Sequence, residues 1–174
     1  MLPPNPNKEL SFEQENLREI YLAGGCYWGV DAWMERVVGV YATESGFANG
    51  KKAGPVTYEE VYTDTTGHTE VVYIKYDETK ISLVGLLTEF FGIINPTLLN
   101  RQADDIGSRY RTGIYYTDPT DQAVIEDFVA EKRADYDKPI VTEVRPLANY
   151  YPGPEEHQKY LEKNPNGYCH ISFD

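Results

Sequence analysis

The sequence predicts one α/β domain, also describable as α+β, in which helices cover a β-sheet. The chain has 174 residues, enough for one domain with a core of its own. Segments with strand character alternate with segments of helical periodicity, which is typical of a sheet covered by helices. No internal repeat, low-complexity tract or interdomain linker interrupts this alternation. The expected order of elements is β-α-β-β-α-β-α-β-α.

The chain is expected to begin with an arm, followed by a strand and a helix. Residues 1–16 are polar and proline-rich, so we expect a flexible N-terminal arm ahead of a single domain over residues 17–174. Residues 18–24, REIYLAG, have the apolar run of a buried strand and end in glycine. A helix starting near Cys26 should follow, because apolar residues recur there at helical spacing. These residues are Cys26, Val30, Trp33, Met34 and Val37.

Two further strands are expected before the middle of the chain. Residues 38–47 favour a strand, and the turn-rich residues 48–55 indicate a long loop. Residues 69–76, TEVVYIKY, alternate in character, and Lys75 marks the outer face. The opposite face, which should point to the core, then holds Glu70, Val72 and Ile74.

The second half of the chain continues the alternation. Residues 82–94 are strongly apolar and helix-like, with Ser82 as the expected N-cap. Residues 95–111 are expected to form a long polar loop, and loops of this length more often have a function than serve only as connections. The remaining elements expected are a strand at 112–117, a helix opened by Asp118-Pro119-Thr120 and reaching about Ala134, a strand at 140–147, a helix at 153–164 stopped by Pro165, and a short tail at 166–174.

The composition limits the classes of function. A formal net charge of −12 disfavours nucleic acids and anionic membranes, because phosphate groups repel a surface of that sign. The N-terminal sequence lacks the apolar core of a secretory signal, and no run approaches the roughly 18 apolar residues of a membrane span. Two cysteines are too few for a disulfide framework, so we expect a cytoplasmic protein. No coiled-coil pattern or apolar stripe suggests assembly, so a monomer is expected. Two cysteines and three histidines without CxxC or HExxH spacing predict no metal site.

The stretch GGCYWG, residues 24–29, contains the first candidate for chemistry. A strand ending in glycines and a helix starting at Cys26 would place the thiol near free N–H groups, where the helix dipole stabilises an anion. A thiol in that position can have a pKa a unit or more below its usual value of about 8.5. The alternative is a cysteine that serves only as a small buried apolar side chain.

Three other features complete the candidates. Tyr27 and Trp28 could frame a pocket for a methyl or sulfur group, or they could simply pack in the core. Glu70 would have a raised pKa if desolvated and could donate a proton near neutral pH, or it could bend out to water. Cys169, in a glycine-containing tail, is suited to attack an oxidised sulfur elsewhere on the protein, or it is an unrelated thiol.

Several of these stretches resemble one family. GGCYWG resembles the Gly-Cys-Phe-Trp-Gly signature of the A-type peptide methionine-S-sulfoxide reductases. The resemblance continues through YEEVYTDTTGHTEVVYIKYD, NRQADDIGSRYRTGIYY, HQKYL and NPNGYC, and it covers about residues 18–170. Several motifs in the same order are far more specific than one pentapeptide. The family's roll-like fold implies a mixed β-sheet covered by helices, with a ferredoxin-like or roll-type two-layer core.

The resemblance implies a role for each matching residue. The catalytic set is Cys26 as the nucleophile, Glu70 as the acid, Tyr58 and Tyr110 as donors to the sulfoxide oxygen, and Cys169 as the resolving cysteine. The substrate-binding set is Tyr27 and Trp28, around the S-methyl group, and Asp105. Tyr27 stands where the family usually has phenylalanine, which adds a hydroxyl group beside the pocket.

The activity implied is reduction of the S epimer of methionine sulfoxide, in proteins and as the free amino acid, as repair of oxidative damage. Cys26 would become a sulfenic acid, and Cys169 would condense with it to form a single intramolecular disulfide. Thioredoxin, or dithiothreitol in vitro, would then reduce that disulfide. The resemblance implies no metal and no bound organic cofactor.

Two other functions fit part of the pattern. A thiol–disulfide oxidoreductase also needs a low-pKa cysteine and a partner thiol, although the Cys-x-x-Cys spacing is absent. A binding module with an acidic, tyrosine-lined groove would recognise oxidised or methyl-bearing side chains without turnover. Comparing insulin disulfide reduction with methionine sulfoxide reduction tests the first alternative. Retained binding in a Cys26→Ala variant would favour the second.

Overall fold

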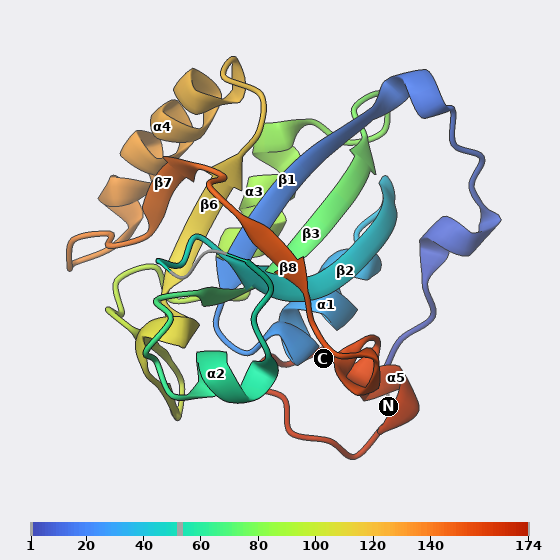
Figure 1. The fold of residues 1–174 in the computed structure, drawn as a ribbon. Coiled ribbons are helices and arrows are strands. Elements are labelled where there is room, and N and C mark those ends of the chain that lie inside the picture. The colour runs from blue at the N-terminus through green and yellow to red at the C-terminus, as the bar shows by residue number, and fades with distance from the viewer. Residues whose placement is uncertain (1, 52–53, 174) are drawn as a thin grey trace.

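The structure is a computed structural model that describes residues 2–51 and 54–173. Residue 1 of the expected arm, residues 52–53 of the expected loop and residue 174 of the tail lie outside the described residues. The centre of the described part is a mixed sheet with the order β7-β6-β1-β3-β2-β8 (Figure 1). Its strands are β1 Leu17–Gly24, β2 Val40–Ala48, β3 Thr69–Asp77, β6 Thr112–Tyr116, β7 Glu143–Pro146 and β8 Tyr150–Pro152. Neighbours run antiparallel except β6 and β7, which are parallel, and this confirms the predicted fold class.

The helices begin where the local sequence supplies caps. They are α1 Tyr27–Glu35, α2 Tyr58–Tyr62, α3 Leu83–Phe91, α4 Asp121–Lys132 and α5 Tyr160–Lys163. The hydroxyl group of Ser82 accepts the N–H of Gly85 at 3.0 Å, which confirms Ser82 as the N-cap of α3. Gly25, with a φ of 87°, turns the chain from β1 into α1, a conformation that favours glycine.

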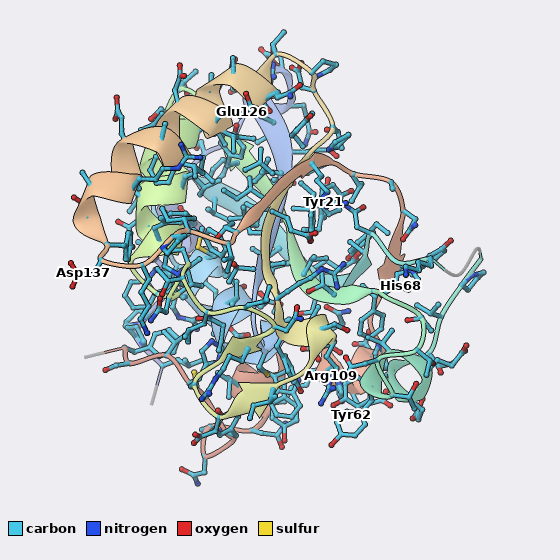
Figure 2. The ribbon with its side chains drawn as sticks, turned by 90° about the vertical axis from the view of Figure 1, so that its left-hand side faces the viewer. Tyr21, Tyr62, His68, Arg109, Glu126 and Asp137 are labelled. Carbon is cyan, nitrogen blue, oxygen red and sulfur yellow. The ribbon has the colours of Figure 1, made fainter. Side chains whose placement is uncertain are left out.

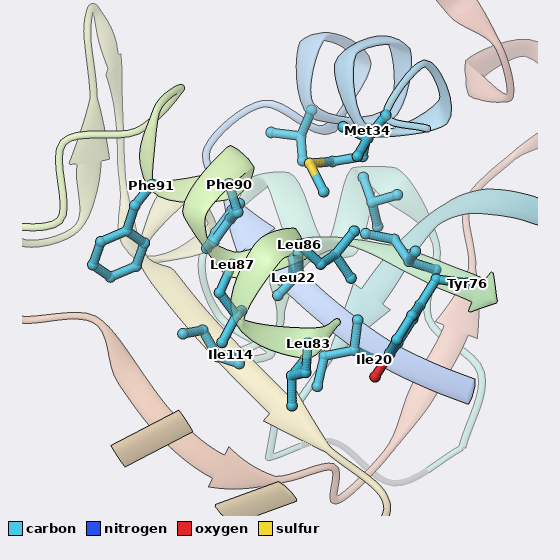
Figure 3. Packing of buried hydrophobic residues seen from close by; sticks show 14 of the residues in the cluster. Ile20, Leu22, Met34, Tyr76, Leu83, Leu86, Leu87, Phe90, Phe91 and Ile114 are labelled. Carbon is cyan, nitrogen blue, oxygen red and sulfur yellow. The ribbon is translucent and has the colours of Figure 1, made fainter. Parts of the chain in front are cut away.

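The main core lies between one face of the sheet and helices α1, α3 and α4. Figure 3 shows this packing, with Leu22 of β1 beneath Leu86 of α3, Ile114 of β6 beneath Leu87 of α3, and Met34 of α1 on the other side of the cluster. The alternation predicted for β3 is confirmed, because its core-facing residues are almost fully buried. These are Glu70, Val72 and Ile74, which are 2%, 0% and 0% exposed. The inward position of Glu70 is therefore set by strand register.

A smaller aromatic cluster covers part of the opposite face of the sheet. The ring of Tyr21 lies 4.9 Å from that of Tyr73 and 5.0 Å from that of Tyr150, measured between centroids. Val71, which is expected on the outer face of β3, is only 1% exposed because this cluster covers it. Both faces of the central strands are therefore buried to some extent.

The expectation of one helix over residues 153–164 was wrong, because the structure has two short helical elements there. A short 3-10 turn, Glu155–His157, is separated from α5 by Lys159, which has a φ of 54°. The Gln158 side chain bonds both main-chain groups of Ser45 in β2, at 3.0 and 2.8 Å. Lys159 Nζ lies 2.9 Å from a carboxylate oxygen of Asp31. Consecutive side chains on a helix point in different directions. Gln158 and Lys159 can therefore both reach partners around β2 and α1 only because the helix is broken between Glu155–His157 and α5.

Other short elements were not expected from the sequence. They are α2, β8 and the two-stranded hairpin of β4 Arg101–Gln102 with β5 Asp105–Ile106. The hairpin and a 3-10 turn at Ser108–Tyr110 give order to the polar loop 95–111. Elements of two to five residues carry too little periodicity for sequence patterns to identify them.

The segment expected to be a flexible arm carries one buried polar anchor. The Asn7 amide nitrogen donates to the carbonyl groups of Glu35 and Val37, at 2.9 and 2.8 Å. Its amide oxygen accepts the N–H of Gly39 at 2.8 Å. Asn7 therefore attaches the N-terminal segment to the end of α1. The flexibility of the arm and the domain boundary at residue 17 stay predictions.

Replacing Asn7 by alanine should lower the free energy of unfolding by about 1 to 3 kcal/mol, because three buried hydrogen bonds are lost together. Urea unfolding measures this change. The matched control is Lys8→Ala, an exposed residue of the same turn, which should change stability by less than about 0.5 kcal/mol. Equal stability of the two variants would contradict the role given to Asn7.

Candidate active site

Cys26 lies at the junction of β1 and α1 and forms the N-cap of that helix. It is 6% exposed, and the main-chain N–H of Trp28 donates to its sulfur, an interaction that favours the thiolate. Burial is the larger effect, and together with the charge of Glu70 it raises the pKa of Cys26 well above the usual value. The expected low pKa was therefore wrong, because the helix N-terminus does not offset desolvation. In the resting protein Cys26 is a thiol.

Glu70 is the second residue of β3, and its carboxyl group faces the start of α1. One carboxyl oxygen accepts the main-chain N–H of Tyr27 at 3.1 Å. Burial raises the pKa of Glu70 to about 8, although this hydrogen bond and the charge of Arg109 act in the opposite direction. Of the two positions that the sequence left open for Glu70, the structure shows the buried one, and the carboxyl group carries a proton at neutral pH.

The two phenols predicted at the site come from separate segments. Tyr58 is the first residue of α2, and Tyr110 ends the turn at Ser108–Tyr110. Burial and the charge of Glu70 raise the pKa of Tyr58 to about 12, and they also raise the pKa of Tyr110. The charge of Cys26 acts on both phenols in the same direction. The fold therefore brings Cys26, Glu70 and two hydroxyl donors around one place.

Arg109 and Asp64 connect the segments that carry the phenols, and sequence analysis did not identify either residue. The guanidinium group of Arg109 lies 2.5 Å from an Asp64 carboxylate oxygen, and its main-chain N–H donates to the other oxygen at 3.0 Å. The guanidinium carbon also lies 4.3 Å from the ring centroid of Tyr62 and 4.4 Å from that of Tyr110. Figure 2 shows Arg109 beside Tyr62. Asp64 and Arg109 are 45 positions apart, so no helical or strand periodicity in the sequence indicates their contact.

Aromatic rings form one side of the site. Trp28 stacks on Tyr160 with ring centroids 3.7 Å apart and planes inclined by 13°. His157 stands edge-on to Tyr58, at 4.5 Å, and to Trp28, at 5.4 Å. Tyr27 lies deeper, at 1% exposure, with its ring 5.8 Å from that of His157. His157 and Tyr160 were not singled out from the sequence, and the only signal was their place in the motif HQKYL.

The second cysteine lies against α1, the helix that Cys26 caps. Both cysteines are free, and Cys169 is partly exposed. A Cβ atom on Gly29 would lie 2.8 Å from the sulfur of Cys169, so this sulfur contacts α1 at Gly29. Cys26 and Gly29 are one helical turn apart, which places the two sulfurs along the same part of α1. The charge of Cys169 also raises the pKa of Cys26.

Asp105 connects the polar loop to the tail that carries Cys169. One of its carboxyl oxygens lies 4.0 Å from Nδ1 of His170, and the hydroxyl group of Tyr168 donates to its side chain. Nε2 of His170 lies 3.2 Å from the carbonyl oxygen of Gly24, at the end of β1. Burial raises the pKa of Asp105. These contacts hold the tail beside the strand that leads to Cys26.

The site combines a buried thiol, a protonated carboxyl group and two phenols. Such a set can supply electrons from sulfur while proton donors stabilise an oxygen on the substrate. Among residues 2–51 and 54–173, no group of three or more His, Cys, Asp or Glu side chains could hold a metal ion. Within the same residues, no helix has the length and apolar character needed to cross a membrane.

Comparisons with known proteins agree on one family. Residues 18–174 match the family described as peptide methionine sulfoxide reductase. Peptide methionine sulfoxide reductase MsrA from Clostridium botulinum (strain Okra / Type B1) is 54% identical, over 91% of this chain and 100% of its own length. The crystal structure of reduced Mxr1 from Saccharomyces cerevisiae is similar with a TM-score of 0.87 at 31% identity, covering 95% of this chain and 96% of that chain. The structure of Mxr1 in complex with Trx2 shares the fold with a TM-score of 0.61 at 22% identity, covering 88% and 91%.

Proposed function

The chain belongs to the peptide methionine sulfoxide reductase family and is an oxidoreductase, and we propose that it reduces the S epimer of methionine sulfoxide through a sulfenic acid on Cys26. The observation that carries this proposal is geometric. The buried thiol of Cys26 forms the N-cap of α1, and the buried carboxyl group of Glu70 accepts the N–H of Tyr27, the next residue. The sulfoxide group is uncharged and polar, so a neutral thiol can approach its sulfur while a neutral carboxylic acid donates a hydrogen bond to its oxygen.

In the first step the sulfur of Cys26 attacks the sulfur of the sulfoxide. Glu70 donates a proton to the sulfoxide oxygen, with Tyr58 and Tyr110 as hydrogen-bond donors, and it regains a proton from the thiol. The oxygen passes to Cys26, so a thiol and a sulfoxide give a sulfenic acid and a methionine. Two electrons leave the cysteine sulfur and reduce the substrate sulfur. The high pKa of Cys26 at rest means that its thiolate forms only as its proton is accepted within the site.

In the second step the thiol of Cys169 attacks the sulfenic acid of Cys26. A disulfide forms and one molecule of water leaves, which balances the atoms and the electrons. The contact of Cys169 with Gly29, one turn from Cys26, supports this pairing. The dithiol of a thioredoxin then reduces the disulfide. The complex of Mxr1 with Trx2 supports a thioredoxin as the partner.

Selection of one epimer follows from the arrangement of the walls. The stacked ring of Trp28 would hold the S-methyl group, and Glu70 with the phenols would hold the oxygen. With both groups held, only one configuration presents its sulfur to Cys26. Asp105 would line the same pocket from the side of the tail.

Separate assays of peptides that contain the R or the S sulfoxide test this function, each with dithiothreitol and with thioredoxin. Only the S epimer should be reduced, and both reductants should support repeated turnover. Equal rates for the two epimers would contradict the geometry proposed for the pocket. Turnover with dithiothreitol but not with thioredoxin would contradict the proposed partner.

Replacing Glu70 by glutamine should slow the single-turnover reduction on the order of 10²-fold or more, because the amide has no acidic proton to give. The amide oxygen can still accept the N–H of Tyr27, so the KM should change little. Glu70 acts in its protonated form, so its contribution should be present below about pH 8 and be lost above it. The wild-type profile should show this ionisation, and the variant should lack it. An unchanged single-turnover rate would remove Glu70 from the acid role.

A further inference from the structure

Tyr27 is attached to two different parts of the site. Its main-chain N–H donates to Glu70, and its side-chain oxygen lies 2.7 Å from Nδ1 of His157. A phenylalanine at this position would lack the hydroxyl group and with it the contact to His157. A buried phenol almost always has a hydrogen-bond partner, and this contact gives Tyr27 one. The added hydroxyl group therefore holds the side chain of His157.

His157 stands between the catalytic rings and a groove on the surface. A cavity of about 300 Å³ begins at Tyr58 and His157. Its other walls include Val56, Glu59, Pro152 and Glu156. The groove adjoins the site, because Tyr58 and His157 line it and their rings, with centroids 4.5 Å apart, also stand beside the catalytic residues. A substrate held by its methylsulfinyl group in the pocket would extend neighbouring residues of its chain into this groove.

We propose that Tyr27 and His157 form a positioning pair that improves binding of methionine sulfoxide within a peptide relative to the free amino acid. This inference rests on the proposed function. The hydroxyl group of Tyr27 donates to Nδ1 of a neutral His157, whose pKa burial lowers. The imidazole ring is thereby held as a wall of the groove. The occupant of the groove is the polypeptide next to the oxidised methionine.

The other walls of the pocket have supports that do not depend on this hydroxyl group. Trp28 is held by its stacking on Tyr160. Tyr58 is held by α2, whose first turn is fixed by a capping box between Thr57 and Glu60. Glu70 is held by the main chain of Tyr27 and not by its side chain. Removing the hydroxyl group should therefore release His157 alone and leave the catalytic groups in place.

The Tyr27→Phe variant tests the pair with little risk to folding, because phenylalanine keeps the ring that fills this buried position. The KM for a peptide that contains the S sulfoxide should rise about threefold to tenfold, the scale of one lost hydrogen bond. The KM for free methionine sulfoxide should rise less than the KM for the peptide, because the free amino acid has no neighbouring residues to place in the groove. The matched control is Tyr115→Phe, which removes a buried hydroxyl group 2.6 Å from Glu143 on the other face of the sheet. This control should leave both KM values unchanged.

A double-mutant cycle with His157→Phe separates a specific pair from a general loss of packing. Each single variant should raise the peptide KM, and the double variant should be no worse than the poorer single variant. Additive effects would overturn the pair. An unchanged peptide KM in Tyr27→Phe would overturn the positioning role, and equal increases for peptide and free substrate would overturn the groove as its target. A wild-type enzyme that reduces neither substrate would instead contradict the proposed function.

Discussion

Replacing Cys26 by serine should abolish reduction of methionine S-sulfoxide. Serine fits the same buried N-cap, but its hydroxyl group is a far poorer nucleophile than a thiol and cannot enter the cysteine oxidation series. Loss of a nucleophile typically costs on the order of 10⁴-fold or more in rate. The measurement is methionine release from a peptide S-sulfoxide, with dithiothreitol as the reductant so that no second cysteine is needed.

The Cys169→Ser variant is the matched control, because it removes the other thiol while leaving Cys26 in place. It should release about one methionine per enzyme in a single turnover, whereas Cys26→Ser should release none. Thermal unfolding of both variants checks that the fold is retained. Activity of Cys26→Ser near that of the wild type would refute the assignment of the nucleophile.

Replacing Cys169 by serine should eliminate turnover driven by thioredoxin. Without a second thiol beside Cys26, the sulfenic acid has no intramolecular partner, and no disulfide forms for thioredoxin to reduce. The expected result is a first turnover of normal rate followed by no further product with thioredoxin. Dithiothreitol, a small dithiol, should still support cycling by attacking the sulfenic acid directly.

Mass spectrometry after one equivalent of substrate distinguishes the possible outcomes. The wild type should lose two hydrogens by forming the disulfide, and Cys169→Ser should gain one oxygen. Full thioredoxin-driven cycling by Cys169→Ser would mean that Cys169 is not the resolving cysteine. The free thiols in this structure correspond to the reduced state from which both experiments begin.

Much of the fold could be predicted from local patterns. The strand before Cys26 and the helix after it follow from apolar spacing and from the glycines between them. The inward position of Glu70 follows from the alternation of β3. These features depend on residues close in the chain, where the periods of helix and strand are visible. The raised pKa of Glu70 was one of two outcomes that the sequence left open, and it follows from this alternation because the inner face of a central strand is buried.

The shorter elements and the break in the segment 153–164 could not be predicted. The break at Lys159 depends on Asp31 and on Ser45, which contacts its neighbour Gln158, and both partners lie more than a hundred positions earlier in the chain. The motif HQKYL resembled a helix because its local composition suits one. Hydrogen bonds to a distant strand outweighed that preference, since tertiary contacts commonly override helix propensity.

By itself the sequence determined the family, the sheet covered by helices and the segments on which the candidate residues lie. Only the tertiary structure decided the ionisation of Cys26 and the partner of the Tyr27 hydroxyl group. The helix N-terminus that should favour a thiolate is a local feature, whereas the desolvation that opposes it depends on every group packed around the sulfur. His157 likewise reaches Tyr27 only through the folding of a segment 130 positions away. Local geometry is encoded by neighbours in the chain, but burial and charge are summed over neighbours in space.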